Sequence, residues 1–202
     1  MPRVGLDSEA VVIAAAQLAD AEGLEALTLA RLAGRLGVRS PSLYAHVGGL
    51  EDLRRRVAAR GARQLAEALA MAAAGKSRLG ALRAMADTYR AYARAHPGTY
   101  ATLQRAPVED GGEFATAARH LVDVIVAVLE GYSIHGDQAI HAVRVVRAAL
   151  HGFVVLERDE GFRIPLSVDE SYERMVAVLD RGLAGGPFGG SPRAPPRTPR
   201  RR

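Results

Sequence analysis

The chain has 202 residues, of which 49% are hydrophobic, 5% are aromatic and none is cysteine. This length is enough for one good hydrophobic core, or for a small domain beside a larger one, and the dominance of alanine and leucine favours packed helices over sheets. The lack of cysteine excludes disulfide scaffolds and thiolate chemistry. Because we find neither a signal peptide nor an apolar run of about 18 residues, we expect a cytosolic protein without a membrane partner.

The net charge of +5 is concentrated at the C-terminal end of the sequence. Residues 187–202 hold five arginines and no acidic side chain, so the rest of the chain carries 22 basic and 22 acidic residues. The same segment contains five prolines and two glycines, and we predict a disordered tail over residues 185–202. Its arginines favour a nonspecific, salt-sensitive attraction to DNA, although a dispensable terminus is the interpretation that we prefer.

Two short helices are predicted at the start of the chain. The first begins after Asp7 or Ser8, either of which can cap it, and ends at Gly23. Its apolar face is formed by Val11, Ala15 and Leu18. The second follows Thr28, a natural N-cap, and ends at Gly37, which can adopt the left-handed conformation of a C-terminal cap. Its apolar face is formed by Leu29, Leu32, Ala33 and Leu36.

A third helix is predicted directly after this glycine turn. Ser40 can cap it, and Pro41 suits its first position, where a missing N–H costs nothing. Leu43 and Val47 lie four residues apart on the buried side. The side chains left accessible are those of Ser42, Tyr44, Ala45 and His46, with Arg39 and Ser40 at the leading end. This distribution is typical of a DNA recognition helix, whereas an ordinary helical hairpin is the alternative interpretation.

The order and spacing of these motifs resemble the N-terminal domain of the tetracycline-repressor (TetR) family. The matching motifs cover residues 14–18, 22–24, 29–33, 36–38 and 42–47. The resemblance implies base or groove contacts from Arg39, Ser40, Pro41, Ser42 and Ala45, and phosphate contacts from Thr28, Tyr44 and His46.

One position departs from the family pattern. Members usually start the fourth helix with a polar pair such as Asn-Lys, where this chain has Gly49 and Leu50. The phosphate contact of that lysine is therefore missing, and free N–H groups at the helix start or nearby arginines have to replace it. The nearby arginines are Arg31, Arg35, Arg54 and Arg55.

Five or six further helices are predicted, and no strand pattern competes with them. They cover residues 50–74, 78–96, 99–105, 114–133 and 137–157, followed by a last helix that starts at Ser167 or Asp169. Residues 106–112 form a loop by composition, and residues 161–165 form a connector. We predict an all-α fold of about nine helices, with a helix-turn-helix domain over residues 1–57 and an effector-binding and dimerisation domain over residues 58–184.

The last two helices resemble the WHG-type regulatory domain of one branch of the family, although the usual tryptophan is missing. Residues 150–157 and 96–100 carry this resemblance. It implies that these helices pair with their symmetry mates in a four-helix bundle, and that the dimer reads a pseudo-palindromic operator. The expected interface residues are Ala148, Ala149, Gly152, Phe153, Leu156, Val176 and Leu179. In the alternative, these side chains complete the core of a monomer.

The resemblance also implies that a small-molecule effector binds in the larger domain. The candidate contacts are Met85, Tyr89, Tyr92, His96, Tyr100, Leu103, Phe114, His120, Arg147 and His151. Each of these is also explained as a packing residue.

Nothing in the sequence favours an enzyme. The six histidines include no pair at i, i+4, and we find neither a glycine-rich phosphate loop nor a nucleophile elbow. We therefore expect no catalytic site, no metal and no cofactor. The main prediction is a DNA-binding repressor, and two alternatives stay open: a nonspecific DNA-organising protein that relies on its basic tail, and a helical interaction module that never meets DNA.

Overall fold

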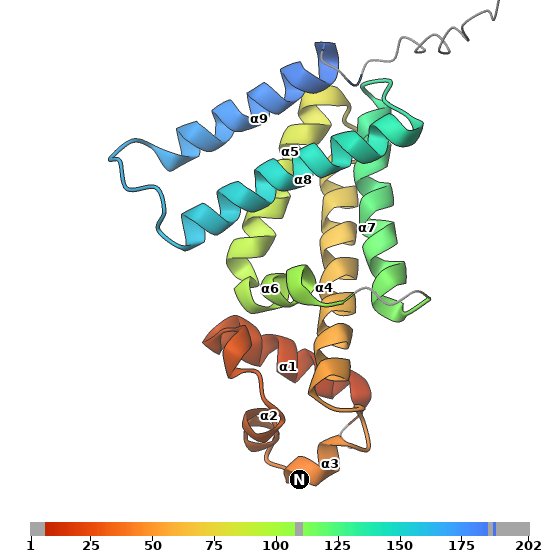
Figure 1. The fold of residues 1–202 in the computed structure, drawn as a ribbon, viewed down its shortest axis with the longest axis vertical. Coiled ribbons are helices and arrows are strands. Elements are labelled where there is room, and N and C mark those ends of the chain that lie inside the picture. Colours follow the sequence, from red (N-terminus) through yellow and green to blue (C-terminus); the bar gives the residue numbers. More distant parts are fainter. Residues whose placement is uncertain (1–6, 108–110, 186–187, 189–202) are drawn as a thin grey trace, which may run out of the picture.

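The computed structural model describes residues 7–107, 111–185 and 188, and this part of the chain is helical without a strand (Figure 1). Its elements are α1 (Ser8–Glu22), the 3-10 turn η1 (Leu24–Ala26), α2 (Leu29–Leu36), α3 (Ser40–Leu43), α4 (Leu50–Ala73), α5 (Arg78–Ala95), α6 (Pro97–Arg105), α7 (Glu113–Glu130), α8 (Gly136–Arg158) and α9 (Val168–Gly185). The predicted all-α fold of about nine helices is confirmed. The predicted tail lies almost entirely outside the described residues.

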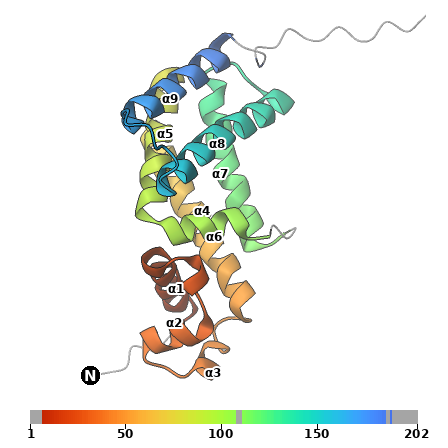
Figure 2. The same cartoon turned by 60° about the vertical axis from the view of Figure 1, so that its left-hand side comes forward.

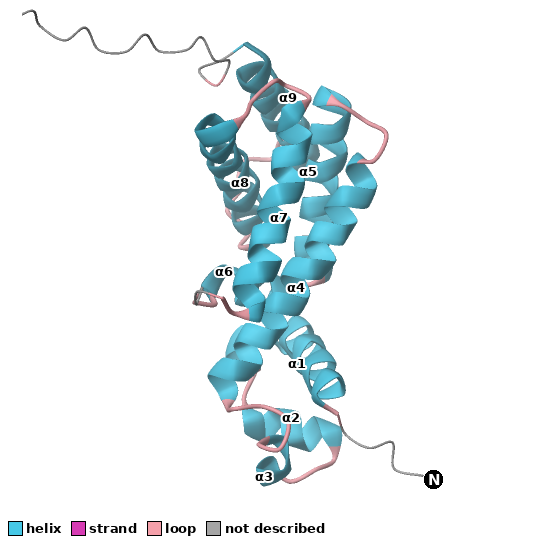
Figure 3. Ribbon diagram, turned by 90° about the vertical axis from the view of Figure 1, so that its right-hand side faces the viewer, coloured by secondary structure: helices cyan, strands magenta, loops and turns pink. Residues whose placement is uncertain are grey.

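The helices form a small head and a larger body, which the long helix α4 connects (Figure 2). The head contains α1, α2, α3 and the first turns of α4, around a core of its own that includes Leu18, Leu32 and Leu43. In the body, α5 and α7 pack along α4, while α8 and α9 cover the end farthest from the head (Figure 3). The largest core cluster lies here, among α4, α5, α7, α8 and α9.

The predicted caps of the first two helices are confirmed. The side chain of Asp7 accepts a hydrogen bond of 2.7 Å from the N–H of Ala10, and the hydroxyl of Thr28 accepts one of 3.2 Å from the N–H of Arg31. Gly37 ends α2 with φ of +67°, in the left-handed region that favours glycine. These local interactions fix the angle at which the chain enters α3.

The predicted start and length of α3 were wrong. Arg39, not Ser40, is the N-cap, and no side-chain hydrogen bond caps the helix, so Ser40 and Pro41 occupy its first two positions. The helix ends after one turn at Leu43, and the backbone continues in turns to Val47. Leu43 and Val47 are nonetheless both buried, as predicted, because they pack into the core of the head.

A second correction concerns α6, which begins at Pro97 rather than at residue 99. Proline suits the first turn of a helix because its missing N–H has no partner there. The proline that ends α5 therefore also starts α6, and His96 alone joins the two helices.

Helix α8 corrects the statement that the chain has no membrane-length apolar run. By length and composition, α8 alone among the helices of the described residues could cross a membrane. One side of it, however, is packed into the body through residues such as Val146, Leu150 and Val154, as in a core helix of a helical bundle.

Candidate functional site

The candidate DNA-reading surface is the tip of the head, where α3 lies at the end of the molecule opposite α8 and α9 (Figure 1). Tyr44 is 62% exposed although it is a large aromatic side chain. The other predicted contacts divide by exposure: Arg39, Pro41, Ser42 and Ala45 are exposed, and Thr28, Ser40 and His46 are half-buried. All eight predicted residues are thus at least partly accessible, whereas Leu43 between them is buried.

Two neighbouring helices hold this surface in place. The carbonyl oxygen of His46 accepts hydrogen bonds from the hydroxyl of Ser8 on α1, at 3.0 Å, and from the guanidinium of Arg56 on α4, at 3.2 Å. Asp52 accepts a 2.9 Å hydrogen bond from the N–H of Gly48 and pairs with Arg56. Burial opposes ionisation, but these two interactions together hold the pKa of Asp52 below its usual value. The turn after α3 is therefore fixed on both sides, which limits how the reading surface can move.

Most arginines near the reading surface have acidic partners. Arg31 pairs with Glu22, and Arg54 and Arg55 pair with Glu51 and Asp52 on the first turn of α4. Arg35, in contrast, is exposed and forms no ion pair within the described part of the chain. Exposed ion pairs are weak, so the paired arginines can still exchange a carboxylate for a phosphate, but Arg35 needs no exchange.

The body contains a cavity of about 300 Å³ between α4, α5, α6, α7 and α8. Four of the ten predicted effector contacts line it: Tyr89, Leu103, Phe114 and Arg147. Sequence reasoning missed two polar lining residues, Gln104 on α6 and Arg144 on α8. Arg144 precedes Arg147 by three residues, and this helical spacing was a usable signal because it places both side chains on one face.

The other six predicted effector contacts do not line this cavity. Tyr100 and His151 form a second layer behind Tyr89: the hydroxyls of Tyr89 and Tyr100 are 2.7 Å apart, and the hydroxyl of Tyr100 lies 2.6 Å from Nδ1 of His151. Tyr92 donates a 3.2 Å hydrogen bond to the carbonyl of Gly61 on α4. Met85 is buried in the core, His120 is exposed on α7, and His96 points to the head.

His96 belongs to the joint between head and body. Asp20 on α1 accepts hydrogen bonds from the backbone N–H of Thr99, at 2.7 Å, and from its hydroxyl, at 3.1 Å, while Nδ1 of His96 lies 3.1 Å from the same carboxylate. Asp20 thus caps the start of α6 from a helix of the head.

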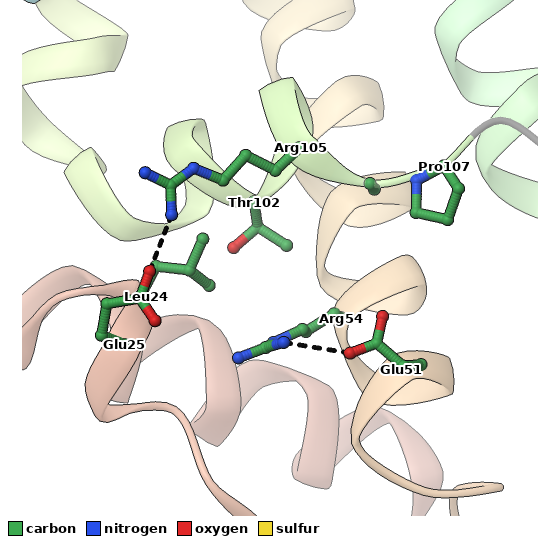
Figure 4. A pocket seen from close by; sticks show the side chains of 8 residues that line it. Leu24, Glu25, Glu51, Arg54, Thr102, Arg105 and Pro107 are labelled. Carbon is green, nitrogen blue, oxygen red and sulfur yellow. Dashed lines mark hydrogen bonds and ion pairs between the residues drawn. The ribbon is translucent and has the colours of Figure 1, made fainter.

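A small cavity of about 120 Å³ lies beside this joint, between η1, α4 and α6 (Figure 4). Two ion pairs border it, one of 2.7 Å between Arg105 and Glu25 and one of 3.0 Å between Arg54 and Glu51. The pair from Arg105 links α6 to η1, so it adds a second tie between body and head.

Comparisons with known proteins identify the family. The model of the tetracyclin repressor-like C-terminal domain matches residues 82–179. An uncharacterized HTH-type transcriptional regulator of Mycobacterium tuberculosis is 39% identical over 88% of this chain and 82% of its own length, and a second one, YobS of Bacillus subtilis, is 33% identical over 90% and 95%. The chain belongs to the TetR family. It is a DNA-binding transcriptional regulator with a helix-turn-helix motif.

Solved structures of TetR-family regulators have the same fold. A TetR variant from Acinetobacter baumannii AYE in complex with minocycline superposes with a TM-score of 0.63 at 21% identity, covering 89% of this chain and 97% of the other. At this identity the likeness shows the fold alone.

The predicted dimer residues of this TetR-family chain fall into two groups. Ala148 and Leu156 are exposed, and Ala149 and Gly152 are half-buried, whereas Phe153, Val176 and Leu179 are buried inside the protomer. The accessible apolar side chains follow a helical spacing on α8, and Val145 extends the row by one turn. Val178 on α9, which sequence reasoning missed, is a further apolar side chain that is 57% exposed.

Proposed function

We propose that this chain is a homodimeric transcriptional repressor that binds a pseudo-palindromic operator and is released by a small molecule bound in the body. The observation that carries the proposal is the exposed reading surface of the head, where hydroxyl, aromatic and imidazole side chains gather above a fixed backbone. We assign base or groove contacts to Arg39, Ser40, Pro41, Ser42 and Ala45, and phosphate contacts to Thr28, Tyr44 and His46. The name of the matching family model supports repression.

The apolar surface of α8 and α9 supports a dimer. In a single protomer, the α8 row of Val145, Ala148, Gly152 and Leu156 stays exposed or half-buried. In the proposed two-fold dimer, two heads bind half-sites about one helical turn apart, or somewhat more. A single short α3 makes too few contacts to select one site among many.

The path for release runs through α6. Leu103 and Gln104 near its C-terminal end line the cavity, and Thr99 at its N-terminal end is bound to Asp20 of the head. A ligand that favours another position of α6 therefore changes the position of the head. By linkage, such a ligand weakens operator binding by the same factor by which the operator weakens ligand binding.

We also propose a division into a DNA-binding domain over residues 1–57 and an effector-binding and dimerisation domain over residues 58–184, with α4 crossing the boundary. Membership in a family of transcriptional regulators supports a cytoplasmic protein that is not an enzyme.

The test is a selection from random DNA duplexes with the full chain, followed by affinity measurements on the enriched sequence. The double variant Tyr44→Ala, His46→Ala should bind this sequence about 1,000-fold more weakly, because a dimer loses two phosphate contacts in each head and each is worth about 1 kcal/mol. The matched control is Met71→Ala, since Met71 is exposed on α4 at a distance from the head.

Both variants should keep the elution volume of the parent. Unchanged binding by the double variant would overturn the assignment of the reading surface. Binding without enrichment of any sequence indicates a DNA-organising protein, and no binding at all indicates an interaction module.

A further inference from the structure

The polar groups of the body cavity are gathered on one of its sides. The walls contributed by α4 and α7 are apolar and include Leu65, Phe114 and Ile125. The polar lining residues come from α5, α6 and α8: Tyr89, Gln104, Arg144 and Arg147. A ligand that fits this cavity therefore has an apolar body and a polar group at one end.

The charge on the polar side is positive and uncompensated. Arg147 donates a 2.8 Å hydrogen bond to the side-chain oxygen of Gln104, which is neutral. Neither Arg144 nor Arg147 forms an ion pair with an acidic residue in the described ranges, and no aspartate or glutamate stands among the described residues that line the cavity.

Some arginines of the body are held by carboxylates, in contrast to the two in the cavity lining. Arg90 and Arg94 both pair with Glu157, and Arg158 pairs with Asp159. Arg144 and Arg147 line the cavity without such a carboxylate, so they have free capacity for an anion there, and a guanidinium matches a carboxylate in a two-point geometry.

The remaining polar groups stay neutral at neutral pH. Burial raises the pKa of Tyr89, so its phenol keeps its proton, and burial together with Arg147 and Arg158 lowers the pKa of His151, so its imidazole is uncharged. Tyr89 lines the cavity, and Tyr100 and His151 continue the hydrogen-bonded row behind it. A neutral phenol at this position can donate to an anionic oxygen without adding a second negative charge.

We propose that the effector is a small organic anion, with its carboxylate or an equivalent acidic group at Arg147 and Arg144 and its apolar body against α4 and α7. This inference rests on the proposed function, because it names the chemical class that the effector site takes. The anion competes with Gln104 for the guanidinium of Arg147, so its binding breaks the 2.8 Å link between α8 and α6.

The experiment measures ligand binding to the full chain by calorimetry, in the absence of DNA. The probes are matched pairs of the same shape, one charged and one neutral: octanoate and octanamide, phenylbutyrate and phenylbutyramide, and naphthoate and naphthamide. At least one acid should bind about tenfold more tightly than its amide, a modest factor because both arginines are exposed to solvent.

The variant Arg147→Met keeps an unbranched, flexible side chain at this position and removes its charge. It should reduce the preference for the acid to about twofold or less, whereas Arg119→Met, on the exposed surface of α7 and not in the cavity lining, should leave it unchanged. Helical circular dichroism should be the same for all three proteins, so a loss of preference is not a loss of fold.

Three results overturn the inference: no acid in the panel binds, acids and amides bind equally, or the preference survives in Arg147→Met. Its failure is distinguishable from failure of the proposed function. An acid that binds but does not change operator affinity leaves the anion inference standing and refutes effector release. An amide that binds as tightly as its acid and releases the operator refutes the anion inference and leaves effector release standing.

Discussion

The joint between head and body depends on a close approach that a single methyl group would prevent. At Gly98, the second residue of α6, an added Cβ would lie 2.0 Å from the carbonyl oxygen of Ala19 and 2.7 Å from the N–H nitrogen of Asp20. Both are backbone atoms of α1, so no side-chain rotation relieves the overlap. In Gly98→Ala, α1 and α6 have to separate by about 1.4 Å to reach an ordinary van der Waals distance.

This separation also breaks the capping interaction, because the 2.7 Å hydrogen bond from the N–H of Thr99 to Asp20 cannot survive it. Overpacking costs about 1 to 3 kcal/mol, and the loss of a hydrogen bond to a charged group costs about 1.5 to 3 kcal/mol, partly for the same displacement. We therefore expect Gly98→Ala to lower the free energy of unfolding by about 3 kcal/mol.

The assay is denaturant unfolding of the full chain, followed by circular dichroism. The control is Gly80→Ala in α5, where the nearest atom to a new Cβ is 3.9 Å away, so the substitution should be neutral or stabilise the helix by about 0.5 to 1 kcal/mol. Equal stability of Gly98→Ala and the parent would refute the close packing of α1 on α6.

Three further predictions concern the body, its outer face and the tail. Glu157→Gln removes the carboxylate shared by Arg90 and Arg94, and should cost about 2 to 3 kcal/mol at pH 7 in urea unfolding. The hydrogen bond from Arg90 lowers the pKa of Glu157, so the ion pair stabilises the fold fully above pH 4.5, the ordinary pKa of the carboxyl, and this stabilisation is lost as the pH falls through the lowered pKa. The difference in unfolding free energy between parent and variant should therefore disappear in acid. A difference that persists there contradicts this origin. Leu156→Asp should yield a monomer in light scattering with native helicity, while Met71→Asp, at a still more exposed position on α4, should not; a dimeric Leu156→Asp variant rules out the α8 row as the interface. Deletion of residues 187–202 should reduce the salt dependence of DNA binding without changing the selected sequence, and a changed sequence preference would give the tail a reading role.

Local signals predicted the head well because its caps depend on residues that are close in sequence. Asp7, Thr28 and Gly37 act within a few residues of their positions, so residue type and spacing were sufficient. The end of α3 was missed for the opposite reason. The turn after it is held by Ser8 and Arg56, which lie 38 and 10 residues from His46, and no local pattern carries that information.

The same limit explains why six of the ten predicted effector contacts do not line the cavity. His96 was a reasonable pocket candidate by its place in the chain, but its partner Asp20 lies 76 residues earlier. Helical periodicity indicates which residues of one helix share a face, as Arg144 and Arg147 do. It does not indicate whether that face meets a cavity or a neighbouring helix, and for this reason Met85 and Tyr92 could not be separated from Tyr89.

Helix α6 is the element in which these separate observations meet. It has nine residues, and Thr99 and Gln104 are five residues apart, which is about 7.5 Å along a helix. A helix this short moves as a rigid unit, so a displacement of Gln104 by a ligand reaches Thr99 almost undiminished. Because the backbones of α1 and α6 are already in contact at Gly98, α6 cannot move toward α1 without displacing the head. Under the proposed function, the cavity at one end of α6 and the fixed joint at the other couple ligand binding to the position of the head. A ligand then shifts this equilibrium only by the difference in its affinity for the two states.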